Sequence, residues 1–447
     1  MNDKIDKMVP PLNYEVMEVI FPHINGKLLA RCEQVCKLWK EVVQSLSKRT
    51  HIWKTCCEKE IDEDVRIELL NSCYPRWHIM CPSDSEWRVV YRTWCEWHHV
   101  GRWPHITKNV CGDFNLEAVT CMKISGRYII SGHTNGGVYF WNSNNCVKVA
   151  SHMTHVIDLG VMVFNGECRN DSPQMKHDLV VSVSYGHNIQ LNPLGFKYKE
   201  LCGFPVVVEE DFEAVITLRT FGNIFVSLTS TGSVSIWQLN ASPCNTNVPE
   251  IIKLHTVRMA RPHIQAVTIW GNKTIQVSAL AHTGLCSPIF RGGDSGSYEL
   301  LQDGAFRQFS SPDTWKEIRS RKILKVFLWR YGISILLTDQ HFMYTSVNGC
   351  RPVKYNTMPY LHSYPITVLL YGEILLLGME CGTLYMYLLS HITDLLTLNL
   401  AQVYWKHSLG QHPIIALDIA ETSDGPVIAA TTRYTIYRIL FIPPRLR

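Results

Sequence analysis

The sequence predicts a mainly β protein with a smaller helical part at its N-terminal end, and three observations support this division. A unit of short alternating strands and glycine turns recurs from residue 118 onward. The first hundred residues instead place apolar side chains at helical spacing. The chain has 447 residues, 46% of them apolar and 18% charged, which is typical of a folded chain long enough for a small and a large domain.

The clearest copy of the repeated unit spans residues 118–142. An alternating strand is followed by a turn at Gly126, where a positive φ costs little, then by a second apolar strand and a third that ends near Trp141. Residues 214–240 repeat this pattern as far as Trp237. One such unit cannot bury its own faces, so we expect the copies to pack against one another.

Weaker copies lie between and after these two. The full set of seven predicted units covers residues 118–142, 155–191, 214–240, 264–290, 323–344, 364–388 and 412–439. Seven units are within the usual range for a closed β-propeller. The sequence therefore predicts a propeller of seven four-stranded blades.

This pattern resembles the WD-repeat family, and the resemblance covers residues 102–447. The family's closing dipeptide is Trp-Asp, whereas this chain has Trp141-Asn142 and Trp237-Gln238. In this family a strand before the first unit completes the last blade. The resemblance thus implies that a strand within residues 102–110 pairs with strands from residues 414–440 and closes the ring.

The first helices are predicted from a stripe of apolar residues that begins after Pro10 and ends before Pro22. Two further apolar stretches follow, one at residues 27–33 and one at residues 35–43. Together they resemble an F-box, carried here by Val9-Pro10, Ile20-Phe21-Pro22-His23-Ile24, Leu28-Leu29, Val35-Cys36-Lys37-Leu38-Trp39 and Ile52-Trp53. The residues that the resemblance assigns to adaptor binding are Pro10, Leu12, Val16, Ile20, Leu28, Leu29, Val35, Cys36 and Trp39.

Residues 56–101 are predicted to be helical, with aromatic side chains at helical spacing around Trp87 and Trp94. Because the stretch is poor in glycine and serine, we expect a firm linker. The predicted domains are an F-box at residues 1–55, a helical linker at residues 56–101 and a WD-repeat-like propeller at residues 102–447. A generic helical hairpin that caps the propeller is the alternative to the F-box.

Composition and motifs exclude several function classes. The net charge is +4 without a basic run, so no nucleic-acid partner is expected. No signal peptide and no membrane span are predicted, and the sixteen cysteines lack metal-ligand spacing, so free thiols, no metal and no cofactor are expected. No catalytic motif is found, and an enzyme built on the propeller is a disfavoured alternative. A cytoplasmic or nuclear location is expected.

The two resemblances together imply the substrate receptor of a Skp-cullin-F-box (SCF) ubiquitin ligase. The F-box would bind a Skp-type adaptor and through it a cullin-RING ligase, and the propeller would hold a protein substrate. A WD-repeat scaffold with a degenerate F-box is the rival interpretation.

In the WD-repeat family, one face of the propeller commonly binds ligands. On this chain the corresponding loops carry acidic residues early, at Glu117, Asp211 and Glu213. Later loops carry the basic and histidine residues predicted to bind substrate, Arg261, His263, Arg321, Lys322, His362 and His412. Such a rim would suit an acidic or phosphorylated peptide, because arginine matches phosphate geometry. Incidental charge on a solvated rim is the alternative.

Overall fold

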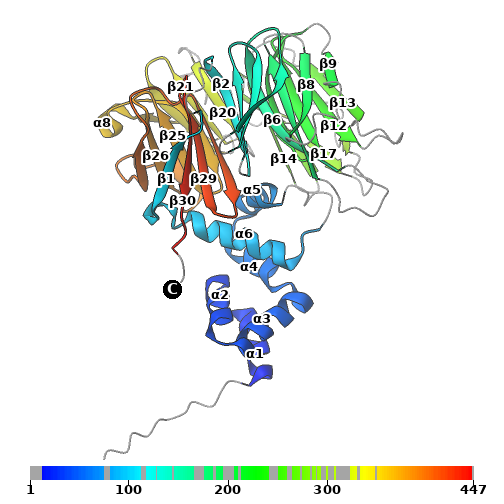
Figure 1. Ribbon diagram of the computed structural model, residues 1–447, viewed down its shortest axis with the longest axis vertical. Helices are drawn as coiled ribbons and strands as arrows, with labels where there is room; N and C mark the ends of the chain where they lie inside the picture. The colour runs from blue at the N-terminus through cyan, green and yellow to red at the C-terminus, as the bar shows by residue number, and fades with distance from the viewer. Residues whose placement is uncertain are drawn as a thin grey trace, which may run out of the picture. The chain divides into compact units, whose positions relative to one another are not determined.

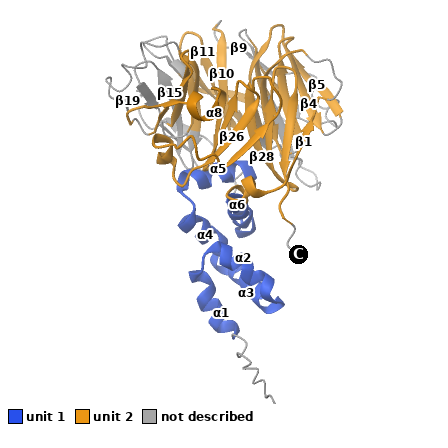
Figure 2. Ribbon diagram, turned by 90° about the vertical axis from the view of Figure 1, so that its left-hand side faces the viewer, with its two compact units in different colours: residues 1–95 blue, residues 96–447 orange. Residues whose placement is uncertain are grey.

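The computed structural model divides the chain into two compact units, residues 1–95 and residues 96–447 (Figure 2). The structure describes residues 13–74, 81–111, 117–126, 128–142, 145–165, 176–184, 188–194, 206–209, 213–240, 250–258, 264–271, 274–281, 284–287, 289–292, 298–300, 307–308, 323–329, 333–347 and 350–444.

The first unit is helical, as the apolar stripes predict (Figure 1). Its elements are α1 (Tyr14–Ile20), η1 (Phe21–His23), α2 (Gly26–Val35), α3 (Lys37–Thr50), α4 (Ile52–Glu60), α5 (Glu63–Cys73) and α6 (Asp84–Trp97), whose last two residues belong to the second unit. The Asn25 side chain begins α2 by accepting a hydrogen bond from the Leu28 amide at 2.8 Å, which is the usual function of an N-cap asparagine.

A small apolar core holds these helices together. Met17, Leu29, Val42 and Trp53 are fully or almost fully buried. Gly26 is needed where α2 approaches α6, because a β-carbon at this position would lie 2.4 Å from the Tyr91 ring. The core therefore depends on close packing at one glycine as well as on apolar area.

The second unit consists mainly of strands. They are β1 (His105–Asn109), β2 (Val119–Ser125), β3 (Tyr128–His133), β4 (Gly137–Asn142), β5 (Asn145–Ser151), β6 (Val156–Asn165), β7 (Lys176–Ser184), β8 (Asn188–Leu194), β9 (Val206–Glu209), β10 (Val215–Phe221), β11 (Ile224–Thr229), β12 (Ser233–Asn240), β13 (Glu250–Arg258), β14 (Ile264–Gly271), β15 (Thr274–Ala281), β16 (Gly284–Ser287), β17 (Ile289–Gly292), β18 (Tyr298–Leu300), β19 (Arg307–Gln308), β20 (Ile323–Leu328), β21 (Ser334–Thr338), β22 (Phe342–Ser346), β23 (Val353–Asn356), β24 (Pro365–Tyr371), β25 (Ile374–Met379), β26 (Thr383–Leu388), β27 (Trp405–Ser408), β28 (Ala416–Thr422), β29 (Gly425–Thr431) and β30 (Ile436–Phe441). Short helices are η2 (Val100–Arg102), α8 (Met358–Leu361) and η4 (Ile392–Leu396).

These strands form a β-propeller with six regular blades, so the predicted count of seven four-stranded blades is wrong. Each regular blade is an antiparallel sheet of four strands, for example β2-β3-β4-β5. The first strands of successive sheets contact one another in a circuit, from β2 through β6, β10, β14, β20, β24 and β28 back to β2.

The sheet that departs from the pattern contains β14 to β19. It has six strands, because two short strands, β16 and β17, pair with opposite ends of β15. Pro288 stands between them in the sequence and has no amide hydrogen to give to a strand ladder. Strand spacing in the sequence predicted a unit here, but it could not show that the unit's later strands are divided.

The closing strand is confirmed in position. β1 pairs with β30 in antiparallel register, from His105 opposite Phe441 to Asn109 opposite Tyr437. An N-terminal strand therefore completes the sheet made by the last three strands of the chain, and the ring has no gap at this seam.

The two repeat tryptophans are buried and hydrogen-bonded. The Trp141 Nε1–H donates to the Ser131 hydroxyl at 2.8 Å, and the Trp237 Nε1–H donates to the Ser227 hydroxyl at 2.9 Å. In both blades the serine lies ten residues before the tryptophan, on the neighbouring strand. A serine thus satisfies each indole in sheets that lack the aspartate of the WD dipeptide.

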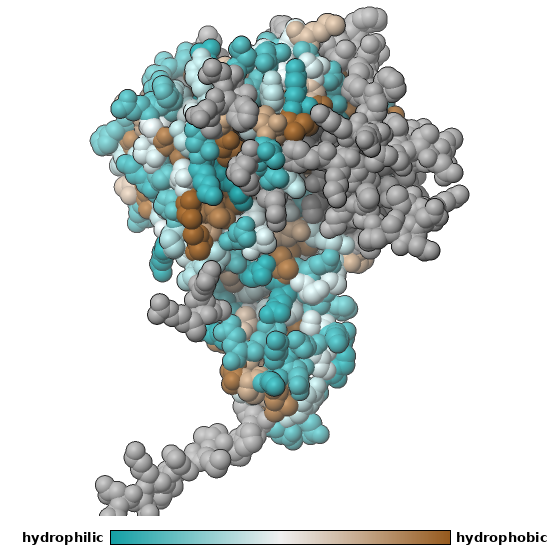
Figure 3. All heavy atoms as spheres, in the orientation of Figure 1, coloured by the Kyte–Doolittle hydropathy of each residue, from teal (hydrophilic) through white to brown (hydrophobic). Residues whose placement is uncertain are grey.

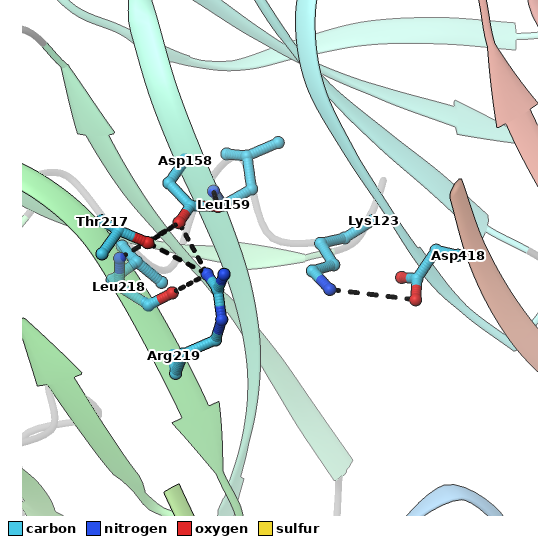
Figure 4. A network of polar contacts seen from close by, with 7 residues as sticks. All are labelled: Lys123, Asp158, Leu159, Thr217, Leu218, Arg219 and Asp418. Carbon is cyan, nitrogen blue, oxygen red and sulfur yellow. Dashed lines mark hydrogen bonds and ion pairs between the residues drawn. The ribbon is translucent and has the colours of Figure 1, made fainter. Parts of the chain in front are cut away.

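Two aspartates join the first strands of neighbouring sheets (Figure 4). One oxygen of Asp158 on β6 accepts hydrogen bonds from the Thr217 hydroxyl, the Leu218 amide and the Arg219 guanidinium of β10, at 2.6, 3.1 and 2.8 Å. Asp418 on β28 accepts from the Ile124 amide of β2 at 2.9 Å, and burial raises its pKa. These carboxylates are engaged in structural contacts between sheets.

Two further features are absent from the described part of the chain. No helix there has both the length and the apolar character needed to cross a membrane. Among the same residues, no group of three or more histidine, cysteine or acidic side chains could hold a metal ion. The twelve cysteines whose side chains the structure describes are free thiols.

Candidate functional site

An apolar face on α1, α2 and α3 is the main candidate site of the helical unit. Large apolar side chains are exposed there although the unit has an apolar core of its own; they are Val16, Val19, Ile20, Leu28, Val35 and Leu38. The exposed fractions of Val19 and Val35 reach 67% and 61%. Figure 3 shows hydrophobic side chains gathered on this end of the unit. A contiguous exposed apolar surface usually marks a partner site.

The structure places seven of the nine predicted adaptor-binding residues. Val16, Ile20, Leu28, Val35 and Cys36 are exposed on this face, and Trp39 is half-buried. The Trp39 ring packs on Phe21 with ring centroids 5.4 Å apart. Leu29 is fully buried and supports the face from within the core. Pro10 and Leu12 lie outside the described residues.

The break between α2 and α3 shapes this face. Cys36 has an extended backbone, with φ of −161° and ψ of 172°, so the chain changes direction between Val35 and Lys37. Val35 consequently ends α2 as one of the most exposed apolar residues of the unit. The Val-Cys-x-x-Trp pattern therefore corresponds to a helix junction rather than to one long helix.

A buried carboxylate on α6, that of Asp84, holds α3 and α4 in place. Asp84 accepts hydrogen bonds from the Ser47 hydroxyl at 2.6 Å and from the Trp53 and Lys54 amides at 3.3 and 3.0 Å. These amides belong to the first turn of α4, where His51 makes no side-chain cap of its own. Asp84 thus caps α4 from another helix, and its negative charge suits the positive end of that helix.

Glu60 makes the second such connection. Its two carboxylate oxygens accept from the Gly26 amide at 2.8 Å and from the Tyr91 hydroxyl at 2.7 Å, so it joins α2, α4 and α6. Burial and this hydrogen bond raise the pKa of Tyr91. No motif in the sequence indicated Asp84 or Glu60, because their hydrogen-bond partners lie thirty or more residues away in the sequence.

The rim of the propeller is the second candidate site. In three of the regular blades a described hydrogen bond joins the turn between the second and third strands to the segment that enters the first strand; for example, the Glu380 amide donates to the Tyr364 carbonyl at 3.0 Å. On this rim Glu117, His362 and His412 are exposed, and Glu213 is half-buried. The Thr229 hydroxyl donates to Glu213 at 2.7 Å, so this acid has a structural function.

The predicted substrate residues are only partly placed. His362 and His412 are exposed at the entries to β24 and β28. Arg261, His263, Arg321, Lys322 and Asp211 lie outside the described residues. The structure therefore does not bring the predicted basic set together. It does bring together His341, Tyr364 and Glu380, which no motif in the sequence indicated, because each comes from a different loop.

Comparison with known proteins finds sequence similarity to F-box proteins over a short part of the chain. No family model matches the chain. The chain is 30% identical over 95 residues to F-box/SPRY domain-containing protein 1 of Drosophila persimilis, which is 20% of this chain and 36% of that protein. The Drosophila mojavensis protein of the same name is 36% identical over 67 residues, covering 14% and 26%. The chain therefore spans about a third of the length of the curated relatives it matches.

Among solved structures, the chain is similar to the computationally designed Ika8 protein with a TM-score of 0.38 and 14% identity, covering 74% of this chain and 98% of that one. A likeness of this size supports no argument about fold or function. The sequence similarity to F-box proteins and the β-propeller itself are the findings that bear on function.

Proposed function

We propose that this protein is the substrate-recognition subunit of an SCF-type ubiquitin ligase. The observation that carries the proposal is the exposed apolar face of α1, α2 and α3, which contains Val16, Ile20, Leu28 and Val35 of the F-box pattern. We infer that the similarity to F-box proteins falls on this unit, because it carries the F-box pattern. A Skp-type adaptor with an apolar surface would cover the face.

The propeller serves in this proposal as the substrate-binding part, and its blades are of the WD-repeat type. The mechanism is proximity, because holding a substrate beside a loaded conjugating enzyme raises the effective concentration of its lysines. No covalent step and no cofactor belong to this chain. The cytoplasm or nucleus is the proposed location. Binding of an acidic or phosphorylated substrate depends on Arg261, Arg321 and Lys322, and it stays a prediction.

Affinity purification of the full-length chain from cells tests the proposal. Wild-type protein should recover a Skp-type adaptor and a cullin. Ile20→Asp together with Val35→Asp should remove both, because the two charges would have to be buried at the interface. Val89→Asp is the matched control, since Val89 is an exposed valine on α6 outside the face. It should leave adaptor recovery unchanged.

The same experiment separates the rival interpretation. A scaffold with a degenerate F-box would recover propeller-bound partners without adaptor or cullin, both from wild-type protein and from the double variant. Loss of adaptor from the Val89→Asp control as well would show that the variants act through folding of the helical unit rather than through its apolar face.

A further inference from the structure

Three loops of the propeller form an exposed surface on the predicted rim, and apart from His362 no residue of these loops was indicated by the sequence. The turn between β21 and β22 contains Asp339 and His341, the segment before β24 contains α8 and Tyr364, and the turn between β25 and β26 contains Glu380. The His341 and Tyr364 rings are stacked, with centroids 3.8 Å apart and planes 19° apart. We call Asp339, His341, Met358, Tyr360, Tyr364 and Glu380 the aromatic-acidic patch.

The short helix α8 presents two apolar side chains on this surface. Met358 and Tyr360 are 46% and 58% exposed, whereas Leu361 on the same turn is buried. The backbone around them is fixed, because the Tyr385 hydroxyl donates to the Leu361 carbonyl at 3.4 Å and the Thr357 hydroxyl donates to the Ser363 carbonyl at 2.8 Å. A rigid backbone that exposes a tyrosine offers contact area at a low entropic cost.

Two histidines of these loops have an unusual backbone conformation. The φ angles of His341 and His362 are 64° and 54°, in the left-handed region that side chains other than glycine seldom occupy. In the described part of the chain only one other residue with a β-carbon, His51, has a positive φ. Such positions often occur at binding surfaces, where the surrounding structure holds them in place.

The described residues of the patch carry acidic groups, whereas the whole chain has a positive net charge. The segments at residues 339–341, 357–364 and 380–382 contain Asp339 and Glu380 and no lysine or arginine, although the chain has a net charge of +4. Both acids are exposed. The Tyr364 hydroxyl donates to the Glu380 carboxylate, which raises the pKa of Tyr364. Asp339 makes no hydrogen bond or ion pair with any described residue.

We propose that the aromatic-acidic patch binds an arginine-containing segment of the protein substrate. The proposal rests on the proposed function only in assigning that segment to a substrate. A guanidinium can stack on a tyrosine face while its planar fork pairs with a carboxylate, and the patch offers both groups. The charge of this substrate segment is positive, whereas the basic rim residues predicted an acidic substrate. The two predictions therefore require opposite results from one experiment.

The test measures fluorescence anisotropy of labelled peptides titrated with the full-length chain. One peptide alternates glycine and arginine, and matched peptides carry lysine or glutamate in place of arginine. The arginine peptide should bind most tightly and the glutamate peptide least, despite the protein's positive net charge. Glu380→Gln and Tyr360→Ala should each weaken arginine-peptide binding about three- to fivefold, the typical size of one exposed ion pair or cation–π contact.

Asp424→Asn is the matched control. Asp424 is an exposed acid in the turn between β28 and β29, and its loss changes the net charge by the same amount as Glu380→Gln. It should leave arginine-peptide affinity unchanged. Three results would overturn the proposal: no saturable binding of the arginine peptide, equal or tighter binding of the glutamate peptide, and equal weakening by Asp424→Asn and Glu380→Gln.

Adaptor recovery separates this proposal from the proposed function. If the chain recovers the adaptor but does not bind the arginine peptide, the patch assignment fails while the ubiquitin-ligase proposal stands. If it binds the arginine peptide through Glu380 without recovering the adaptor, the patch assignment stands as a property of the propeller and the ligase proposal fails.

Discussion

The helical unit and the propeller are stabilised in different ways. The helical unit has a small apolar core, and two carboxylates, Asp84 and Glu60, each join helices that are far apart in the sequence. The propeller instead repeats one arrangement of paired strands, with apolar clusters between neighbouring sheets. Loss of one polar side chain should therefore affect the helical unit most, whereas the propeller spreads its stability over many equivalent contacts.

Removal of the Asp84 carboxylate should have the largest effect. Asp84→Ala leaves the Trp53 and Lys54 amides and the Ser47 hydroxyl without their acceptor, so α4 should lose about 3 kcal/mol of protection. Hydrogen exchange of the peptide that covers α4, measured by mass spectrometry on the full chain, gives the local value. Glu63→Ala, an exposed acid in the first turn of α5, is the control and should change protection little. Equal exchange in the two variants would show that Asp84 does not cap α4.

Within the propeller, the tryptophan bonds provide the next comparison. Ser131 accepts from Trp141 and also contacts the buried His133 at 2.7 Å, and His133 contacts the Glu117 carbonyl at 2.8 Å. Ser227 accepts from Trp237 without a histidine at the matching position. Ser131→Ala should therefore cost about 2 kcal/mol, and Ser227→Ala about 1 kcal/mol. Thermal unfolding of both variants checks this order, and a larger loss for Ser227→Ala would contradict it.

Lowering the pH should also affect the stability of the two units differently. Burial lowers the pKa of His133, His152 and His407 in the propeller, and that of His152 to about 4. A histidine with a lowered folded-state pKa stabilises the protein above its unfolded pKa of about 6.5, and this contribution is lost as the pH falls. Protonation of His152 alone should lower the free energy of unfolding by about 2 kcal/mol between neutral pH and about pH 5.

The pKa values of two carboxyl groups shift upward, opposite to those of the histidines. Burial raises the pKa of Asp418 in the propeller and of Glu33 in the helical unit, so acid favours their folded forms. Among the described residues of the propeller, three histidines lose and one carboxyl gains stabilisation in acid, so we expect acid to destabilise the propeller. Hydrogen exchange at neutral and acidic pH should show loosening of β7, which carries Ser182, and of the end of β5, which His152 directly follows, before loosening of α2. Earlier opening of α2 would contradict this assignment.

The smallest expected effect concerns an exposed ion pair of the helical unit. Arg49 pairs with Glu18 on the surface between α3 and α1. Glu18→Gln should change the free energy of unfolding by less than about 0.5 kcal/mol, because water and salt screen exposed pairs. Chemical unfolding at low and high salt checks the value. A loss similar to that of Asp84→Ala would show that position and burial do not explain the difference between these carboxylates.

The regular parts of the fold were predictable from the sequence because they depend on periodic patterns. Apolar spacing indicated α1 to α3, and the repeated turns at Gly126 and Gly222 indicated the first and third units; both glycines have the positive φ that such a turn requires. The β14 to β19 sheet was not predicted correctly, because two separate short strands, β16 and β17, pair with different ends of β15. Turn spacing carries no information about such a division.

The candidate sites were predictable to different degrees. A linear pattern indicated the apolar face, since its residues lie close in the sequence, but it could not show that Leu29 is buried. The aromatic-acidic patch depends on residues from three separate turns, and the contact between His341 and Tyr364 follows from the packing of two sheets. Contacts of this kind require the fold before they can be found.

Calorimetric titration of a recombinant Skp-type adaptor into the full-length chain tests the central claim most directly. The claim is that the exposed face of α1 to α3 binds the adaptor independently of the propeller. Ile20→Ala with Val35→Ala should raise the adaptor Kd at least about thirtyfold, the result of losing about 2 kcal/mol or more at an apolar anchor, without changing binding of the arginine peptide. An adaptor Kd within about threefold of wild type, or loss of both activities together, would contradict the account.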